Sequence, residues 1–290
     1  MNKFVTGTAE RGIYEIRELL KMLQGAPGGA WVCGGYARYC ASPVNANLNT
    51  VGDLDIYCAN QASYDYVCNE LWQSVKGSNG LTKKIFNSDI GEISKGFETP
   101  NASTFFVERS YVYSGPKLIQ VIKPQTNGNI KTEGGLETIL DNFDFTIARV
   151  GLYQDFNSGE IVVVKDIDFD YHEKVNILVI KNIHCPIGTA LRVAKYSRKG
   201  YEIHVLEMAK LFFDYEKQTD EYKSNLKNDM NELAKMLSEK HGSNKSFDYD
   251  IDNGPVDSNG YPVAGVFRVR PSDQELNEAY QSIYSKLSID

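Results

Sequence analysis

Cysteine is scarce in this 290-residue sequence, and no two cysteines form a C-x-x-C pair. The odd number of cysteines and their irregular spacing argue against a disulfide framework and against a structural zinc site. Buried, reduced thiols are the expected state. The five residues are Cys33, Cys40, Cys58, Cys68 and Cys185.

Long apolar runs are also missing. No stretch reaches the roughly 18 residues that a membrane-spanning helix needs, and Glu10 and Arg11 interrupt the segment in which a signal peptide would require an apolar core. We therefore expect a cytoplasmic protein with no membrane segment. A hydrophobic content of 42% and a charged content of 24% are typical of a globular chain with a proper core.

Positive charge is in short supply overall but concentrated in one place. The net charge of -7 argues against a general polyanion binder. Residues 181–200, however, carry five basic side chains and no acidic one: Lys181, Arg192, Lys195, Arg198 and Lys199. Such an island suits a local phosphate contact, and a solvated helix face explains it equally well.

The hydrophobic pattern predicts two domains, a mixed α+β domain over residues 1–180 and a mainly helical one over 181–290. The first domain opens with strand, glycine turn, helix and strand, and residues 77–103 read as irregular. Expected helices cover residues 10–24, 36–41, 62–76, 133–140, 187–199, 202–217, 220–241 and 272–287, and expected strands cover residues 30–33, 53–58, 104–113, 117–123, 143–153 and 160–165.

Two carboxylates and two glycines stand out in the opening unit. Asp53 and Asp55 are two apart in a predicted strand, so both project from one face. Carboxylates that close repel each other unless a cation lies between them, and Mg²⁺ is the simplest candidate. Gly34 and Gly35 follow the preceding strand and let backbone N–H groups and a helix N-terminus approach a phosphate.

A third carboxylate would complete a site of this kind. Asp144 is the best candidate, because it is a single acid among aromatic and β-branched residues that read as a central strand. A buried, unpaired Asp is costly, so we expect a metal ion or a basic partner beside it. A salt bridge to Arg149 or a strand-end cap is the alternative.

These motifs resemble the DNA polymerase β-like nucleotidyltransferase superfamily, and most nearly the head and neck of CCA-adding enzymes and bacterial poly(A) polymerases. Residues 34–38 (Gly-Gly-Tyr-Ala-Arg) resemble G-G-x-V-R, and residues 53–55 match the D-x-D that follows it. Residues 191–203 resemble the neck pattern L-R-x-x-[RK]-[FY] … G-[FY]-x-I. Residues 142–145 are similar to a strand found in phage and viral members of this superfamily. This similarity would place the protein in the cytoplasm of a host cell.

The resemblance implies a polymerase β-like mixed sheet with flanking helices, a nucleoside triphosphate such as ATP as substrate, two Mg²⁺ ions and an RNA 3′ end as acceptor. Asp53, Asp55 and Asp144 would hold the ions, and Gly34 and Gly35 would cradle the β- and γ-phosphates. The remaining predicted nucleotide-binding residues are Arg38 and the basic stripe of Arg192, Lys195 and Lys199 at helical spacing.

Some positions differ from the family pattern. Tyr39 stands where the family has an acid, Gln120 stands where many relatives carry the third acid, and no E-D-x-x-R or R-R-D element is present. Two alternatives therefore stay open beside transfer to RNA. One is transfer to a protein or a small molecule, and the other is a nucleotide-binding module without catalysis.

Overall fold

A computed structural model describes residues 3–9, 11–44, 51, 53–74, 91–99, 101–109, 118–127, 130–228, 249–250 and 254–255. The chain divides into two compact units, Met1–Phe212 and Phe213–Asp290. This division falls later in the chain than the boundary predicted at residue 180, so the basic segment 181–200 belongs to the first unit.

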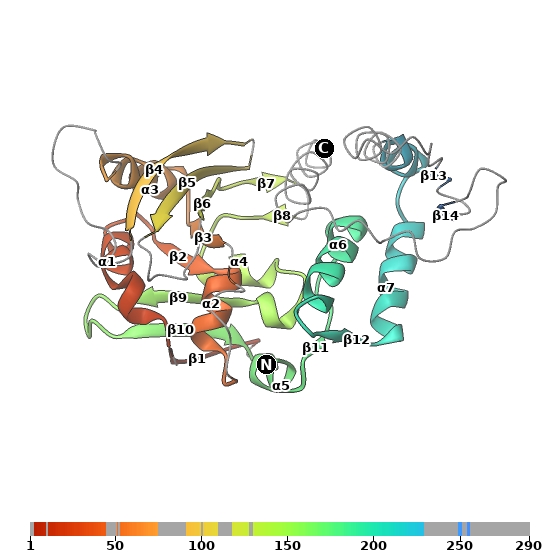
Figure 1. The fold of residues 1–290 in the computed structure, drawn as a ribbon, viewed down its shortest axis with the longest axis horizontal. Helices are drawn as coiled ribbons and strands as arrows, with labels where there is room; N and C mark the ends of the chain where they lie inside the picture. Colours follow the sequence, from red (N-terminus) through yellow and green to blue (C-terminus); the bar gives the residue numbers. More distant parts are fainter. Residues whose placement is uncertain are drawn as a thin grey trace. The chain divides into compact units, whose positions relative to one another are not determined.

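A mixed sheet of eight strands organises the first unit (Figure 1), in the order β1-β10-β9-β2-β3-β6-β5-β4. Neighbouring strands are antiparallel except for the parallel pair β3 and β6. The strands are β1 (Phe4–Thr8), β2 (Ala30–Cys33), β3 (Asp53–Cys58), β4 (Gly91–Glu98), β5 (Ala102–Arg109), β6 (Leu118–Ile122), β9 (Val150–Gln154) and β10 (Ile161–Asp166). The α+β class and the mixed sheet with flanking helices are confirmed.

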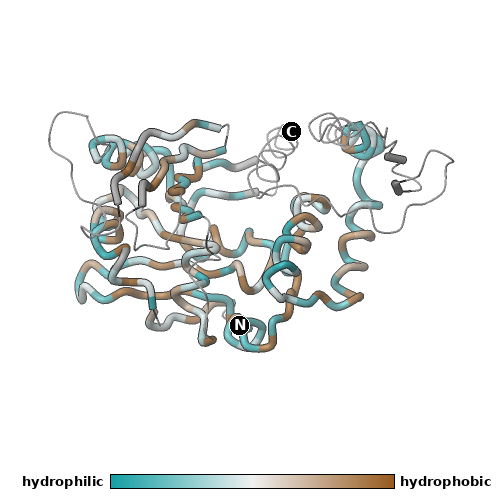
Figure 2. Tube along the Cα trace, viewed as in Figure 1, coloured by the Kyte–Doolittle hydropathy of each residue, from teal (hydrophilic) through white to brown (hydrophobic). Residues whose placement is uncertain are grey.

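The two faces of the sheet have different surroundings. On one face, alternate strand residues such as Leu54, Ile56 and Ile119 pack in the main core against α1 (Ile13–Gln24) and α3 (Gln61–Gln73). The opposite face, which we call the site face, carries Asp53 and Asp55, and α4 (Leu136–Asp141) packs against it in a cluster with residues of β1, β2, β9 and β10 and with Tyr57 of β3. Figure 2 shows hydrophobic residues recurring along these strands and helices.

Several local predictions are wrong. Residues 91–98, expected to be irregular, form strand β4, and the sequence analysis missed strand β1 and helix α5 (Phe169–Val175). The expected strand over 143–153 is formed only from Val150 onward, because Thr146–Ala148 is a 3-10 helix. Helix α2 (Gly34–Ala41) begins at the first glycine of the predicted turn.

The segment after residue 180 is largely helical, as predicted. It contains α6 (Pro186–Ser197), the short strand β12 (Glu202–Ile203) paired with β11 (Ile177–Leu178), α7 (Val205–Glu216) and helical residues 220–228. The remainder of the helix predicted over 220–241, and the helix predicted over 272–287, lie outside the described residues. Within the described ranges, no helix combines the length and apolar character that crossing a bilayer requires. All five cysteines are free thiols, and four of them are buried.

Candidate active site

Strand β3 places the two aspartates side by side on the site face. Leu54 and Ile56 are fully buried in the main core, so the alternating Asp53 and Asp55 point the other way. Asp55 pairs in register with Cys33 on β2 and with Gln120 on β6. The predicted juxtaposition of the two carboxylates is therefore present in the strand geometry.

Helix α2 begins directly beside Asp55. Gly34 has a φ of +70°, and a Cβ added there would lie 3.1 Å from Asp55 Oδ2. The N-cap residue Cys33 makes no side-chain capping hydrogen bond, and a Cβ on Gly35 would meet nothing within 4 Å. The first turn of α2 thus offers backbone N–H groups and open space next to the carboxylates, which suits an anion carried with a cation.

Two features require glycine at position 34, and we predict that Gly34→Ala lowers the thermal stability of the protein. The left-handed backbone costs an L-residue about 1–2 kcal/mol, and the added methyl group would crowd Asp55. The melting temperature of Gly34→Ala, measured by thermal unfolding, should therefore be lower than that of the wild type. Gly35→Ala is the matched control, since its methyl group has space; equal destabilisation by both substitutions would contradict the prediction.

The carboxylate pair has the electrostatics of a cation site. Burial, and after it the negative charge of Asp53, raise the pKa of Asp55 to about 7, while Lys195 acts in the opposite direction. With this raised pKa, Asp55 is fully ionised at neutral pH only when further positive charge is supplied beside it. Two carboxylates on one strand face, beside a backbone cradle that a Cβ would fill, fit the oxygen ligands that Mg²⁺ prefers.

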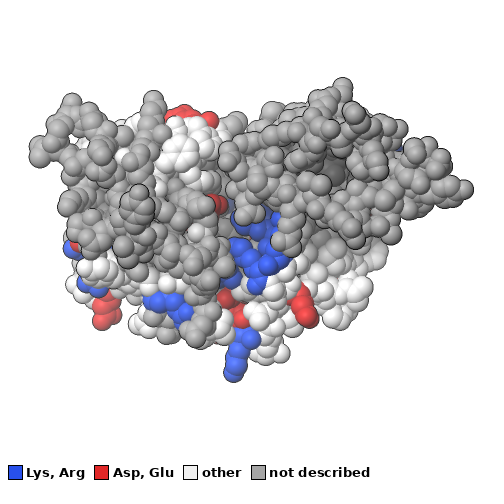
Figure 3. Space-filling model, viewed as in Figure 1, with Lys and Arg blue, Asp and Glu red and all other residues white. Residues whose placement is uncertain are grey.

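Helix α6 brings basic side chains toward this pair. Desolvation lowers the pKa of Lys195, but the negative charges of Asp53 and Asp55 outweigh it, so the pKa is raised. Desolvation and the positive charges of Arg38 and Lys195 lower the pKa of Lys199 to about 8. Figure 3 shows Lys and Arg side chains gathered near the middle of the view, beside the position of α6 in Figure 1. Lys195 is thus the cation from α6 that interacts most directly with the aspartates.

Asp144 is placed differently from the prediction. It lies in the turn before the 3-10 helix, not in a central strand, and its buried carboxylate forms an ion pair with Arg192 on α6. Among the residues that the structure describes, no three His, Cys, Asp or Glu side chains gather to hold one metal ion. Asp144 is thus paired with Arg192 in this structure, and its part as a third metal ligand stays a prediction.

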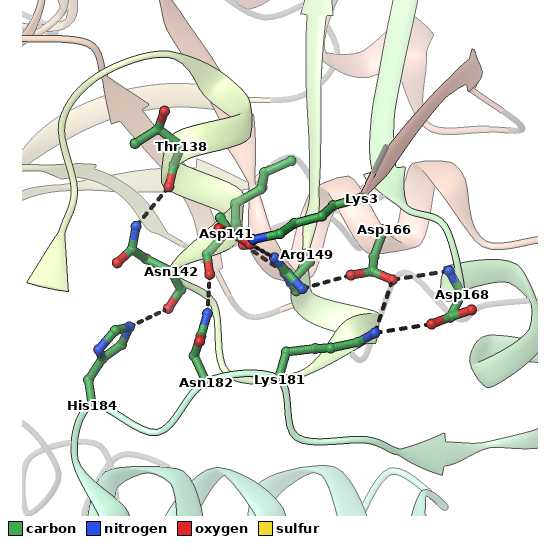
Figure 4. A network of polar contacts seen from close by, with 11 residues as sticks. Lys3, Thr138, Asp141, Asn142, Arg149, Asp166, Asp168, Lys181, Asn182 and His184 are labelled. Carbon is green, nitrogen blue, oxygen red and sulfur yellow. Dashed lines mark hydrogen bonds and ion pairs between the residues drawn. The ribbon is translucent and has the colours of Figure 1, made fainter. Parts of the chain in front are cut away.

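The alternative partner, Arg149, belongs to a separate network, in which Arg149 and Asp166 are buried and the outer members are partly exposed (Figure 4). Its guanidinium donates to Asp166 Oδ2 at 2.8 Å and also pairs with Asp141. Lys181 reaches Asp168 at 3.0 Å and Asp166 at 3.8 Å. This network joins the residue before β9, the end of β10 and the end of α4 to the segment that leads into α6, and Lys181 lies in this segment, before the helix begins.

Arg38 was predicted to bind nucleotide but lies in the interior. It is 6% exposed, donates to the hydroxyl of Tyr201 and pairs with Glu173 Oε1 at 3.4 Å. Glu173 also accepts hydrogen bonds from Ser42 at 2.8 Å and from Tyr201. The guanidinium lies 5.7 Å from the ring of Tyr196 on α6. Arg38 therefore ties α2 to α5 and α6, a role that the sequence analysis missed.

The chain also resembles solved structures in part. No family profile and no curated sequence matches it. The solved structures include a CCA-adding enzyme in its apo form (14% identity, TM-score 0.44, 77% of this chain and 46% of that one) and the Bacillus stearothermophilus CCA-adding enzyme in complex with CTP (16%, 0.39, 69% and 42%). The Thermotoga maritima CCA-adding enzyme complexed with tRNA is similar at 12% identity and a TM-score of 0.38, over 70% of this chain and 43% of that one. This chain thus spans less than half of each, and these values are too low to assign it an activity, a substrate or a partner.

Proposed function

We propose that this protein is a Mg²⁺-dependent, template-independent nucleotidyltransferase that moves a nucleoside monophosphate from a nucleoside triphosphate to a hydroxyl group, with an RNA 3′ end as the acceptor. The observation that carries the proposal is the pair Asp53 and Asp55 beside the open N-terminus of α2. The two carboxylates repel each other and lie next to the backbone N–H groups of a helix N-terminus. This arrangement suits a complex of metal ion and triphosphate better than it suits a metal ion alone or a triphosphate alone.

Each part of the site has a distinct role. Asp53 and Asp55 hold the divalent ions, which when bound neutralise phosphate charge and favour the ionised acceptor hydroxyl. The backbone N–H groups of Gly34 and Gly35 bind the β- and γ-phosphates, and Lys195 offsets the remaining negative charge. The acceptor oxygen forms a bond to the α-phosphorus, the bond to the bridging oxygen breaks, and pyrophosphate leaves.

Two further basic side chains accompany Lys195: Arg192 lies on α6, whereas Lys199, predicted on the same helix face, lies in the turn after α6 ends. Arg192 forms an ion pair with the buried carboxylate of Asp144, which orients its guanidinium. Lys199, with its pKa lowered to about 8, is partly uncharged in mildly alkaline solution. We assign Arg192 and Lys199 to the phosphate groups of the nucleotide or of the acceptor, because Arg192 extends from the same helix as Lys195 and Lys199 lies in the turn that directly follows this helix.

One observation favours a second candidate, a nucleotide-binding module without catalysis. Asp144 is engaged by Arg192, so the described residues bring together two carboxylates where a two-ion mechanism ordinarily uses three. Such a module would bind a metal–nucleotide complex and transfer nothing.

Incubation with α-labelled nucleoside triphosphates and bulk RNA separates these candidates. We predict Mg²⁺-dependent labelling of RNA by the wild type and at least a 100-fold loss with Asp53→Ala. The matched control is Asp65→Ala, an exposed acid on α3. Label on protein or on a small alcohol would instead identify a different acceptor, and nucleotide binding with no labelling would identify the module.

A further inference from the structure

Two exposed phenylalanines lie on the site face beyond the aspartates. Phe97 on β4 is 46% exposed and Phe106 on β5 is 41% exposed, and their ring centroids are 6.1 Å apart. Large apolar rings exposed together on a folded surface usually mark a binding site. The adjacent Phe105, which points to the opposite face, is fully buried against Trp72, so the hairpin is anchored without the exposed pair.

The strand register fixes where this pair lies relative to the carboxylates. Asp53 is directly opposite Leu118 on β6, and Leu118 is directly opposite Phe106 on β5. Residues paired in this way project from the same face of a sheet. Phe106 is therefore two strand spacings from Asp53, or about 10 Å, on the same face.

A distortion of the hairpin brings the second ring to the first. The pairing of β4 with β5 shifts between Lys95 and Glu98. Within this irregular segment, a Cβ on Gly96 would lie only 2.0 Å from the carbonyl oxygen of Thr104, so the two backbones approach closely. Bulges of this kind change the direction of a side chain. Here the result is a continuous aromatic surface, which we call the Phe97–Phe106 pair.

The sheet order decides which ligand group reaches this pair. Gly34 and the N-terminus of α2 follow β2, on one side of β3, whereas the Phe97–Phe106 pair lies on the other side, past β6. In an in-line displacement the attacking hydroxyl enters opposite the leaving pyrophosphate. With the β- and γ-phosphates at α2, the acceptor approaches from the side of β6 and β5.

We propose that the Phe97–Phe106 pair is a stacking surface for the terminal base of a single-stranded polynucleotide acceptor. The proposal rests on the proposed function for the direction of approach. Uncharged aromatic faces stack with any base, and this matches a surface that offers no base-specific polar contact in the pair itself. The distance to the carboxylates is comparable with the reach of one nucleotide unit.

Binding of a short fluorescein-labelled single-stranded RNA, measured by anisotropy without nucleotide or metal, tests the proposal. We expect Phe106→Leu, which keeps apolar area but removes the ring, to weaken binding about tenfold, and Phe106→Trp to preserve it. Phe156→Leu is the control, because Phe156 is 84% exposed in the turn between β9 and β10. A blunt-ended RNA duplex should bind more weakly than the single strand.

The proposal is overturned if Phe106→Leu binds as the wild type does, if the wild type does not bind the single strand, or if the blunt duplex binds equally well. Its failure is distinguishable from failure of the proposed function. If Phe106→Leu binds RNA as the wild type does while labelling still depends on Asp53, the stacking proposal is refuted and the proposed transferase function stands. If Asp53→Ala labels RNA as well as the wild type does, the proposed transferase function is refuted, and the RNA-binding result is judged separately.

Discussion

Asp55→Asn should abolish nucleotidyl transfer and, in metal-free buffer at pH 8, stabilise the fold. The folded-state pKa of Asp55 is raised to about 7 by burial and by Asp53, from an ordinary value of 3.8. The folded state thus binds the Asp55 proton more tightly than the unfolded state does. The contribution of this proton to the free energy of unfolding is lost as the pH rises from about 4 to about 7. Asparagine carries no such proton, so the variant avoids this loss of up to about 4 kcal/mol.

The measurement is denaturant unfolding of the wild type and Asp55→Asn at pH 4 and pH 8, paired with the labelling assay. The difference in the free energy of unfolding should grow with pH, while transfer falls at least 100-fold because a metal ligand is lost. Asp65→Asn, which changes an exposed acid, should alter neither quantity. A variant that is less stable than the wild type at pH 8 would contradict the electrostatic account.

The second large effect is expected at the buried ion pair. Glu173→Gln leaves the Arg38 guanidinium without its counter-charge in the interior, and loss of one partner of a buried pair costs about 3–5 kcal/mol. The melting temperature should fall by about 10 °C for a unit of this size. Scanning calorimetry measures this change.

An exposed pair supplies the control for that experiment. Lys21 Nζ lies 2.7 Å from Glu18 Oε1 on the surface of α1. Exposed ion pairs of this kind contribute at most about 1 kcal/mol to the free energy of unfolding. Glu18→Gln should therefore leave the melting temperature nearly unchanged. If both Gln variants shift it equally, Glu173 does not stabilise the junction of α2, α5 and α6 in the way described.

Local sequence patterns predicted the core of the site. Strand β3 alternates apolar residues with Asp53, Asp55 and Tyr57, a pattern that assigns each side chain to a face without further information. The glycine pair that ends β2 was likewise recognisable, because helix N-termini beside strands favour residues that leave the backbone accessible. These signals span a few neighbouring residues, so no long-range knowledge was needed.

The errors arose where contacts join distant segments. Asp144 meets Arg192 across 48 positions and Arg38 meets Glu173 across 135, and no local pattern encodes such pairings. Alternation around Asp144 suggested a strand, but Phe145 instead packs in a separate core with residues of α6 and α7. Strand β4 was missed because its sequence, GEISKGFE, is polar and contains the glycine at which the pairing shifts.

Binding of Mn²⁺ in the presence of a nucleoside triphosphate, followed by electron paramagnetic resonance, tests whether Asp53 and Asp55 hold a divalent ion. Mn²⁺ shares the oxygen-ligand preference of Mg²⁺. We expect a bound ion in the wild type and in Asp144→Asn, and none in the double variant Asp53→Asn with Asp55→Asn. Equal binding by the double variant, or loss of the ion in Asp144→Asn alone, would contradict this expectation.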